Sequence, residues 1–281
     1  MIPYNFDYYK PYSIAEAANV FEELQAKGKR PLYYNGGTEV ITFARMNSVQ
    51  TGAVIDIKGI PECNVLQMTM DYLVIGSAVT LSEIADSGYY PLLRKVSREI
   101  ADRTSRNKIT LGGNICGKIQ YREAVLPLLI SDAYIEVSGD EGIRKYEIKE
   151  IFEGSPKLKE NEFIVQILIP IENLSLPFFS IKRKRNTAIG YPLISAAAIK
   201  KDGKIRAALS GVATFPFRDM GMEEEINRPG LMPETRAENA IKVMPYKIKD
   251  DLFASAEYRE HLLKNALVKA IEKLEGAYDS I

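Results

Sequence analysis

Two long stretches of the chain carry the apolar spacing of an amphipathic helix. In residues 13–27 apolar side chains recur every three or four positions, with Ser13 placed as an N-cap and Gly28 just beyond the end. Residues 257–275 repeat leucine, isoleucine and valine at the same spacing. We therefore predict a helix near each end of the chain. Shorter helices are expected over residues 91–101 and 123–130, with a further helix start at residues 80–84.

Runs of β-branched and aromatic residues, each bounded by turn residues, predict strands. Residues 65–77 predict a hairpin with its turn at Asp71. Residues 192–200 and 204–212 predict a second hairpin across an Asp-Gly turn. The last helix is expected to pack on the second hairpin. Further strands are expected at residues 30–35, 53–57, 133–137, 163–169 and 177–182.

These elements predict an α+β protein with two domains. The first covers residues 1–172 and is expected to divide into subdomains of about residues 1–58 and 59–172. The second, residues 173–281, is expected to hold an antiparallel sheet with helices. A chain of 281 residues suits two domains, because single hydrophobic cores stop growing near about 250–300 residues.

Two glycine-rich stretches stand beside predicted apolar segments. The first is Asn35-Gly36-Gly37-Thr38-Glu39, and the second is Thr110-Leu111-Gly112-Gly113-Asn114. Adjacent glycines permit positive φ and leave backbone N–H groups open, which is what close approach to a phosphate requires. One Gly-Gly pair is usually only a turn. Two such pairs, with hydroxyl and amide side chains beside them, favour two loops that grip one extended anionic ligand.

Neither stretch matches the common nucleotide-binding motifs. Gly-x-Gly-x-x-Gly is absent, and so is Gly-Lys-Ser/Thr. A classical dehydrogenase and a mononucleotide kinase are therefore disfavoured.

The sequence shows no catalytic apparatus of its own. His261 is the single histidine, and its spacing within the last predicted helix is typical of a surface or packing residue. Cys116 lies inside the glycine-rich motif of residues 110–117 without a second cysteine nearby, and we expect it to be a small buried residue rather than a redox-active one. We therefore predict no catalytic residue and no metal site on this chain.

The amino-acid composition restricts the kinds of partner and cofactor that this chain is expected to bind. The 37 basic and 37 acidic residues cancel, so no overall field attracts nucleic acid or an anionic membrane. With two cysteines and one histidine, the chain cannot ligate a four-cysteine iron–sulfur cluster, so any such cluster is expected on another chain. No signal peptide and no apolar run of membrane-spanning length occurs. We expect a cytoplasmic protein that binds neither nucleic acid nor a membrane.

Two further clusters each have two interpretations. Lys182-Arg183-Lys184-Arg185 is either a strand with alternate residues in solvent, or a phosphate contact or docking patch for an acidic partner. Tyr33 and Tyr34 directly precede the first glycine stretch. They either lie against a planar ring or pack in the core.

Both glycine stretches resemble the FAD-binding (medium) subunits of the molybdenum hydroxylases, the family of xanthine dehydrogenase and carbon monoxide dehydrogenase. The family's first pattern is an apolar pair before Ala-Gly-Gly-Thr-Asp, and Tyr33-Tyr34-Asn35-Gly36-Gly37-Thr38-Glu39 stands in its place. The second is Arg-Asn, two residues, then Thr-apolar-Gly-Gly-Asn, matched by residues 106–114. Residues 132–133, 161–170 and 254–259 agree as well, so the resemblance covers nearly the whole chain.

The resemblance implies a two-subdomain FAD-binding domain of the vanillyl-alcohol-oxidase/PCMH type in the first 172 residues. It also implies a molybdopterin-binding large subunit that oxidises a substrate such as xanthine or another purine. A small subunit with [2Fe–2S] clusters would pass electrons to the FAD on this chain, and NAD or another acceptor would receive them. In this hypothesis the chain is an oxidoreductase subunit similar to that of xanthine dehydrogenase.

The resemblance also implies roles for individual residues. Both glycine stretches would hold the FAD pyrophosphate. Glu123 stands ten residues after Gly113, where the family has an aspartate that hydrogen-bonds the ribityl chain. Ile164 would lie near the flavin, and Lys182 would contact the pyrophosphate or adenine side. The expected cofactor residues are Leu32, Tyr33, Tyr34, Asn35, Gly36, Gly37, Thr38, Glu39, Thr104, Asn107, Thr110, Gly112, Gly113, Asn114, Glu123, Ile164 and Lys182.

Two other classes of function stay open. A stand-alone FAD-dependent oxidoreductase of the vanillyl-alcohol-oxidase fold would need its own substrate pocket and base. A non-catalytic binding module would use the glycine stretches only as turns. The presence of flavin separates the FAD subunit and the stand-alone oxidoreductase from the binding module. Activity of the isolated chain would identify the stand-alone oxidoreductase.

Overall fold

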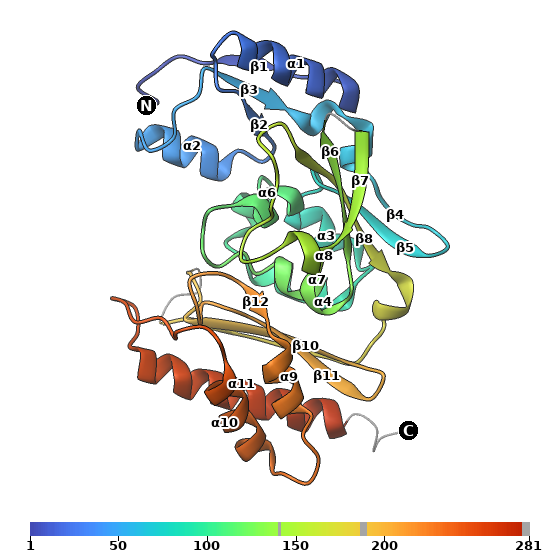
Figure 1. Cartoon of the computed structure of the whole chain (residues 1–281), viewed down its shortest axis with the longest axis vertical. Helices are drawn as coiled ribbons and strands as arrows, with labels where there is room; N and C mark the ends of the chain where they lie inside the picture. Colours follow the sequence, from blue (N-terminus) through green and yellow to red (C-terminus); the bar gives the residue numbers. More distant parts are fainter. Residues whose placement is uncertain (140–141, 186–189, 277–281) are drawn as a thin grey trace. The chain divides into compact units, whose positions relative to one another are not determined.

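The computed structural model describes residues 1–139, 142–185 and 190–276 (Figure 1). Its contacts group the chain into two units. The first contains Met1–Ser87, Arg103–Lys118 and Ala133–Pro170, and the second contains Gly88–Asp102, Ile119–Asp132 and Ile171–Ile281. Two segments of the first 172 residues therefore pack with the C-terminal sheet, while the linear boundary after residue 172 stays a prediction.

The first unit begins with a small parallel sheet. Strand β3 lies in the middle and pairs in parallel with β1 on one side and β2 on the other. Helix α1 follows β1, and its N-cap is Ser13, whose side chain accepts from the N–H of Glu16 at 3.1 Å. The predicted first helix is thus confirmed. The bounds are β1 (Asp7–Tyr9), α1 (Ile14–Ala26), β2 (Leu32–Tyr34), α2 (Thr38–Arg45), β3 (Ala53–Asp56), η1 (Ile57–Gly59) and η2 (Pro61–Asn64).

A five-stranded antiparallel sheet forms the rest of the first unit. Its strand order is β4-β5-β8-β6-β7, with the predicted hairpin β4–β5 at one edge. Thr80 and Glu83 cap α3 as predicted, since the Thr80 N–H donates to the Glu83 carboxylate at 2.8 Å. The bounds are β4 (Leu66–Met68), β5 (Tyr72–Gly76), α3 (Leu81–Ser87), α5 (Arg103–Arg106), α6 (Leu111–Cys116), β6 (Tyr134–Gly139), β7 (Gly142–Glu147), α8 (Ile148–Ile151) and β8 (Phe163–Pro170).

One hydrophobic cluster ties the two sheets of the first unit together. Phe21 of α1 and Ile55 of β3 are buried in the same cluster as Phe163 and Val165 of β8. The two sheets therefore share a core, which fixes the end of β2 where the first glycine stretch begins.

The second unit contains the antiparallel sheet β12-β11-β10-β9. The turn between β10 and β11 has Asp202 at φ 52° and Gly203 at φ 75°, and two successive positive φ angles define the tight hairpin turn that the Asp-Gly pair predicts. The bounds are α4 (Pro91–Glu99), α7 (Val125–Ile130), η3 (Ile171–Asn173), β9 (Phe178–Arg183), β10 (Ile194–Lys201), β11 (Lys204–Ser210), β12 (Phe217–Arg218), α9 (Met220–Ile226), α10 (Pro233–Val243) and α11 (Ala256–Gly276).

Helices cover both faces of this sheet. Helices α9, α10 and α11 lie together on one face, where their apolar residues share a core with Ile194, Ala196 and Leu209 (Figure 1). The expected packing of the last helix on the hairpin is confirmed. Helices α4 and α7 contact β9, β10 and β11 as well. All six residues of α7 are buried, as expected for an uninterrupted apolar helix.

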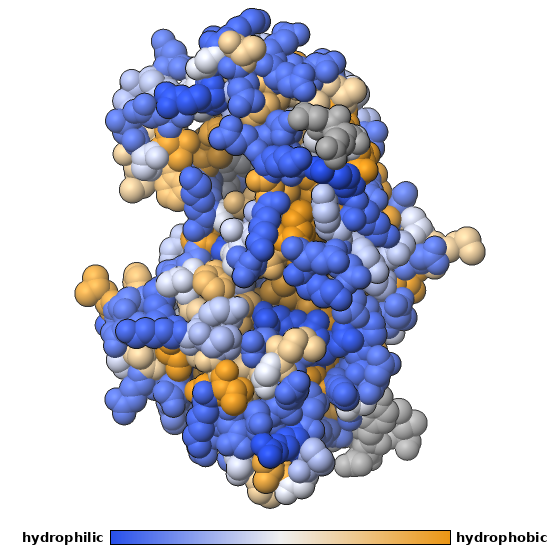
Figure 2. Space-filling model, in the orientation of Figure 1, coloured by the Kyte–Doolittle hydropathy of each residue, from blue (hydrophilic) through white to orange (hydrophobic). Residues whose placement is uncertain are grey.

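The surface agrees with the neutral, mixed-charge composition. Figure 2 shows a mostly hydrophilic face with apolar side chains interspersed. Among residues 1–139, 142–185 and 190–276, no helix combines the length and apolar character needed to span a membrane. His261 is exposed, as expected. The expectation that Cys116 is buried was wrong: it is exposed at the end of α6, and Cys63 is the buried cysteine.

Candidate cofactor site

The two glycine stretches meet backbone to backbone in the first unit. A Cβ atom added to Gly36 would lie 2.0 Å from the carbonyl oxygen of Lys108 and 3.3 Å from the Thr110 nitrogen. No side chain fits in that space. Gly36 is therefore required where it stands, and the pairing of the two stretches inferred from sequence is a physical contact.

Ser77, at the end of β5, connects the two stretches. Its carbonyl oxygen accepts from the side-chain amide of Asn35 at 2.8 Å and from the N–H of Gly112 at 2.9 Å. Gly112 also packs against Ser77 so closely that an added Cβ would lie 2.6 Å from the Ser77 Cβ. One backbone carbonyl thus sets the relative position of both glycine pairs.

A third connection comes from Glu39, in the first turn of α2. Its carboxylate accepts from the N–H of Lys118 at 2.6 Å, just after α6. The same carboxylate lies 3.5 Å from the position that a Cβ on Gly117 would occupy. Glu39 therefore anchors the chain that leaves the second stretch, which is a role within the protein itself.

The two stretches differ in their backbone donors. In the second, the N–H of Gly113 donates to the Thr110 hydroxyl at 3.2 Å and that of Asn114 donates to the Thr110 carbonyl at 2.8 Å. In the first, the N–H groups of Gly36, Gly37 and Thr38 have no acceptor among the described residues. Open backbone donors therefore belong to the first stretch, at the N-terminus of α2.

Positive φ explains only one of the four glycines, contrary to our expectation. Gly37 has φ 70°, and its N-cap position places it over the ring of Tyr34. Gly36 and Gly112 are needed for close backbone approach instead. Gly113 is the least constrained, since an added Cβ would meet only the Thr110 hydroxyl, at 2.9 Å.

The two tyrosines before the first stretch have different environments. Tyr33 stacks on Phe21, with ring centroids 5.0 Å apart, and packs against Phe163 at 4.6 Å. It is a core residue. Tyr34 lies beneath Gly37, and the Lys58 ammonium sits 4.6 Å from its ring centroid. Burial, and then the charge of Asp56, raise the pKa of Tyr34.

Lys58 holds the first stretch from the other side. Its ammonium donates to the carbonyl of Asn35 at 2.8 Å and to the carboxylate of Asp56 at 2.8 Å. Asp56 is 3 % exposed and also accepts from the hydroxyl of Tyr8. Burial opposes ionisation of Asp56, but hydrogen bonds from Lys58 and Tyr8 outweigh burial and lower the pKa of Asp56. The hydrogen bond between Tyr8 and Asp56 raises the pKa of Tyr8 to about 12.

The remaining predicted residues of the first unit differ in their exposure to solvent. Thr110 is buried and caps α6 with its hydroxyl. Asn107 accepts from the hydroxyl of Ser82 at 2.5 Å. Thr104 is exposed on α5, and Leu32 is partly buried in β2. Ile164 is 3 % exposed in β8, beside the core residue Phe163.

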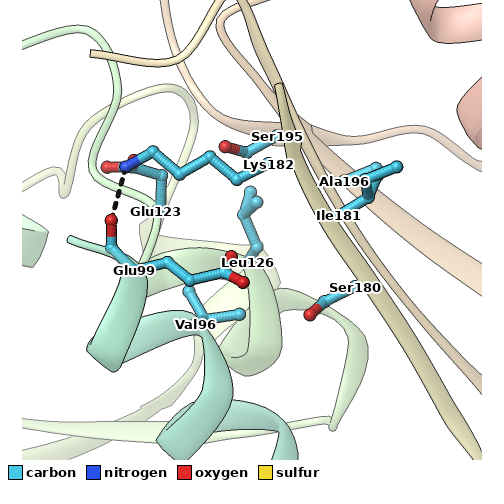
Figure 3. Close-up of a pocket in the computed structure, with 9 residues that line it drawn as sticks. All are labelled: Val96, Glu99, Glu123, Leu126, Ser180, Ile181, Lys182, Ser195 and Ala196. Atoms are coloured by element: carbon cyan, nitrogen blue, oxygen red, sulfur yellow. Dashed lines mark hydrogen bonds and ion pairs between the residues drawn. The ribbon is translucent and has the colours of Figure 1, made fainter. Parts of the chain in front are cut away.

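Glu123 and Lys182 belong to the second unit and contact each other. The Lys182 ammonium lies 2.6 Å from one carboxylate oxygen of Glu123 and donates to the Glu99 carbonyl at 2.8 Å (Figure 3). Both side chains of the pair are less than a tenth exposed. Burial raises the pKa of the Glu99 carboxyl; nearby lysines, Lys182 among them, oppose this, and Glu123 adds to it.

Sequence reasoning missed Ser77, Lys58 and Glu99. Ser77 and Glu99 act through backbone carbonyls, which carry no residue-specific signal. Lys58 follows a predicted strand and closes it, and the two-residue spacing from Asp56 was the one available sign of an ion pair. No group of three metal-ligating side chains occurs in the part of the chain that the structure describes.

The loop chemistry fits a ligand with both phosphate oxygens and hydrogen-bond donors. Three open N–H groups at a helix N-terminus suit phosphate oxygens. The side-chain oxygens of Asn35 and Asn114 are buried with no partner among the described residues. As acceptors they suit hydroxyl or amino groups of a ligand rather than its phosphate. A nucleotide-type cofactor carries both kinds of group.

Residues 4–172 match the family described as the FAD binding domain in molybdopterin dehydrogenase. The chain belongs to this family. Its FAD-binding domain thus contains both glycine stretches, the Ser77 connection and the Lys58 contact.

Similarity to proteins of this kind extends along nearly the full length. The carbon monoxide dehydrogenase medium chain of Hydrogenophaga pseudoflava is 26% identical, over 96% of this chain and 97% of that protein. The xanthine dehydrogenase FAD-binding subunit of Escherichia coli is also 26% identical, over 96% of each. The chain therefore corresponds to a medium, FAD-binding subunit of an oxidoreductase of the molybdenum hydroxylase family.

The fold agrees. A chain of the carbon monoxide dehydrogenase structure from Hydrogenophaga pseudoflava superimposes with a TM-score of 0.84 and 24% identity, covering 98% of this chain and 99% of that chain. The predicted fold class, an α+β FAD-binding domain followed by an antiparallel sheet with helices, is confirmed.

Proposed function

We propose that this chain carries electrons through FAD inside a molybdenum hydroxylase complex. A partner subunit with [2Fe–2S] clusters would supply the electrons, and NAD or another acceptor would receive them. A large molybdopterin-binding subunit would oxidise the substrate. The observation that carries the proposal is the contact of the two glycine stretches at Gly36 and Lys108, within residues of the FAD-binding family.

In this proposal the first glycine stretch binds the pyrophosphate of FAD. The N–H groups of Gly36, Gly37 and Thr38 would donate to its oxygens, helped by the positive end of α2. The N–H groups of the second stretch already donate to acceptors within the protein. This stretch would therefore contribute the Asn114 side chain and the open flank of Gly113. The other predicted residues of the first unit, Leu32, Tyr34, Thr104, Asn107 and Ile164, would line the rest of the site.

Glu123 is proposed to hold the ribityl chain. Lys182 occupies one of its carboxylate oxygens, and the second accepts no hydrogen bond from the described residues. That second oxygen is available to a ribityl hydroxyl. Lys182 itself is proposed to position Glu123, because its ammonium already serves Glu123 and the Glu99 carbonyl.

FAD supplies the redox chemistry when bound, because a flavin accepts single electrons and releases a pair. The residues of this chain bind and orient it. No catalytic acid or base is assigned to the chain, which accords with substrate oxidation on another subunit.

The substrate and the electron acceptor belong to this proposal too. A purine such as xanthine is one candidate substrate, with a xanthine dehydrogenase-like enzyme as the result. The chain is 26% identical to both the carbon monoxide and the xanthine dehydrogenase relatives, so identity favours neither substrate. We also propose a cytoplasmic location, where NAD is at hand.

A visible spectrum of the chain purified with its co-expressed partners tests the flavin. Absorption typical of oxidised flavin is expected, with acid-released FAD in a ratio near one per chain. A preparation that folds but holds no flavin, even after incubation with FAD, would remove the proposal and leave a binding module. Substrate turnover by the isolated, flavin-loaded chain would favour the stand-alone oxidoreductase instead. Assay of the complex with NAD or an artificial acceptor identifies the acceptor.

A further inference from the structure

A small pocket lies in the second unit between the sheet and two helices. Its lining comes from β9 and β10 on one side, and from α4, Glu123 and α7 on the other (Figure 3). The cavity volume is about 10 Å³, at the lower edge of the ~10–15 Å³ that one water molecule needs. The lining residues are Val96, Glu99, Glu123, Leu126, Ser180, Ile181, Lys182, Ser195 and Ala196.

Two serine hydroxyls in this lining are buried without a protein partner. Ser180 and Ser195 are 7% and 5% exposed, and neither hydroxyl has an acceptor or donor among the described residues. Ser195 is the direct cross-strand neighbour of Lys182, and Ser180 precedes Lys182 by two positions on β9. The three side chains therefore leave the same face of the sheet. Buried hydroxyls without partners are costly, and these two differ from other such hydroxyls in lining a pocket, where a ligand would satisfy a hydroxyl that it reaches.

The Lys182 ammonium has one N–H donor more than the acceptors it contacts among the described residues. An ammonium carries three N–H donors, and two of them go to Glu123 and to the Glu99 carbonyl. The side chain is only 6% exposed, so bulk water does not reach it freely. The third donor needs an acceptor inside the pocket.

The charges around the pocket select a neutral ligand. The carboxylate of Glu99 points in among the lining residues, and Glu123 stands beside it (Figure 3). The Lys95 ammonium, which donates to the Ser180 carbonyl at 3.1 Å, and the Lys182 ammonium offset these two carboxylates, so neither sign of charge is in excess and a halide is not favoured. The Lys182 ammonium disfavours a second cation, and the volume excludes larger molecules.

We propose that this pocket is a binding site for one internal water molecule, which joins Lys182 to the hydroxyl of Ser195, its cross-strand neighbour. The water accepts the third Lys182 N–H and donates to the Ser195 oxygen. Ser180 is diagonal to Ser195, about 7–8 Å away, so the same water does not reach both hydroxyls. Two polar partners lie within the range of roughly two to four that a buried water makes. The water completes the surroundings of Lys182 and thereby helps to fix Glu123. The water site does not depend on FAD binding.

Crystallography of the full-length chain, alone or in its complex, tests the site directly. A density peak within hydrogen-bond distance of Lys182 Nζ and Ser195 Oγ is expected, and a bromide soak should give no anomalous peak there. A bromide peak would overturn the proposal. So would an empty pocket with Lys182 turned to donate directly to Ser195.

Thermal unfolding gives a second, independent test. If a water links Ser195 to Lys182, Ser195→Ala removes a satisfied hydroxyl and should lower Tm by about 2–4 °C. Ser97→Ala is the matched control, because Ser97 on α4 is fully buried, its hydroxyl also has no protein partner, and it does not line the pocket. That variant should keep or raise Tm. An equal or higher Tm for Ser195→Ala would show that its hydroxyl is unsatisfied and would overturn the proposal.

Discussion

The side-chain amide of Asn35 donates to the carbonyl oxygen of Ser77 at 2.8 Å, and the N–H of Gly112 donates to the same oxygen. One acceptor thus connects the two glycine stretches of the FAD-binding domain. The family that the chain resembles has alanine where Asn35 stands, so the side-chain bond is an addition to the backbone bond. Its contribution can be measured because the backbone bond from Gly112 remains when Asn35 is changed.

Asn35→Asp is expected to weaken FAD binding by roughly tenfold or more. A carboxylate cannot donate to Ser77, and it would put a negative charge beside the Ser77 carbonyl and next to the N–H groups that are proposed to bind the cofactor phosphates. Asn35→Ala removes only the donor and should weaken binding by roughly two- to tenfold, the range of one neutral hydrogen bond. Flavin fluorescence titration of the apoprotein measures both. Equal affinity of the two variants would argue against a phosphate at the N–H groups that follow Asn35.

Gly113→Val is expected to abolish FAD retention while changing Tm by only a few degrees. An added Cβ would lie 2.9 Å from the Thr110 hydroxyl and meet nothing else within 4 Å, so a small shift of Thr110 accommodates it, but the open flank of α6 is blocked. Gly112→Ala is the contrasting variant, since its Cβ would lie 2.6 Å from the Ser77 Cβ. That change should lower Tm clearly. Full flavin content in a folded Gly113→Val protein would place the pyrophosphate elsewhere.

Lys58→Met tests whether the ion pair with Asp56 holds the first glycine stretch in place. Methionine keeps most of the side-chain volume but loses the hydrogen bond to the Asn35 carbonyl and leaves Asp56 without its cation. We expect weaker FAD binding, by roughly tenfold, and a lower Tm. Lys58→Arg should recover part of both. Affinity unchanged in Lys58→Met would limit Lys58 to a stabilising role.

Lys182→Met is expected to destabilise the second unit by about 3–5 kcal/mol, because Glu123 would be left as an unpaired buried carboxylate. Adding Glu123→Gln should restore part of the loss, since the remaining amide is neutral. Differential scanning calorimetry of both single variants and the double variant completes the cycle. Additive losses would mean that the two side chains do not stabilise each other.

Local chemistry made some elements predictable from sequence. Ser13 and Gly28 mark the ends of α1 within a residue or two, and the Asp202-Gly203 turn sets the register of β10 and β11. The two glycine stretches were also recognisable, because each carries its residues within one short segment. In each case neighbours in sequence make the contacts that decide the structure.

Contacts between distant segments were not predictable in the same way. The residues around Gly36 in the sequence do not indicate that the Lys108 carbonyl lies so close that a Cβ on Gly36 would clash with it. The conformational freedom of glycine suggested a positive φ angle instead. Ser77 was missed because a backbone carbonyl looks alike at every position. Cys116 was expected to be buried because cysteine is a residue type that is often buried, whereas its exposure depends on where α6 ends. Tertiary packing decides these features, and one sequence does not display it.

Asp251 makes the stability of the second unit dependent on acid pH. Burial alone would raise its pKa, but hydrogen bonds from Lys249, from the Phe253 N–H and from Arg259 outweigh burial and hold the pKa well below its ordinary value of 3.8. Arg259 is fully buried and also donates to the carbonyls of Leu193 and Gly211. The ionised carboxylate therefore balances a buried guanidinium.

The lowered pKa of Asp251 determines the direction in which stability changes with pH. Above pH 3.8 the contribution of Asp251 to the free energy of unfolding is fully present, and it is lost as the pH falls below that value toward the pKa of the folded state. Asp251→Asn should therefore lower Tm strongly at neutral pH, and its difference from wild type should shrink as the pH falls below 3.8. Glu238→Gln is the matched control, because Glu238 forms an exposed pair with Lys264 and should leave Tm nearly unchanged at every pH. Thermal melts of the three proteins at a series of pH values measure this. A constant Tm difference between Asp251→Asn and wild type across the series would contradict the lowered pKa.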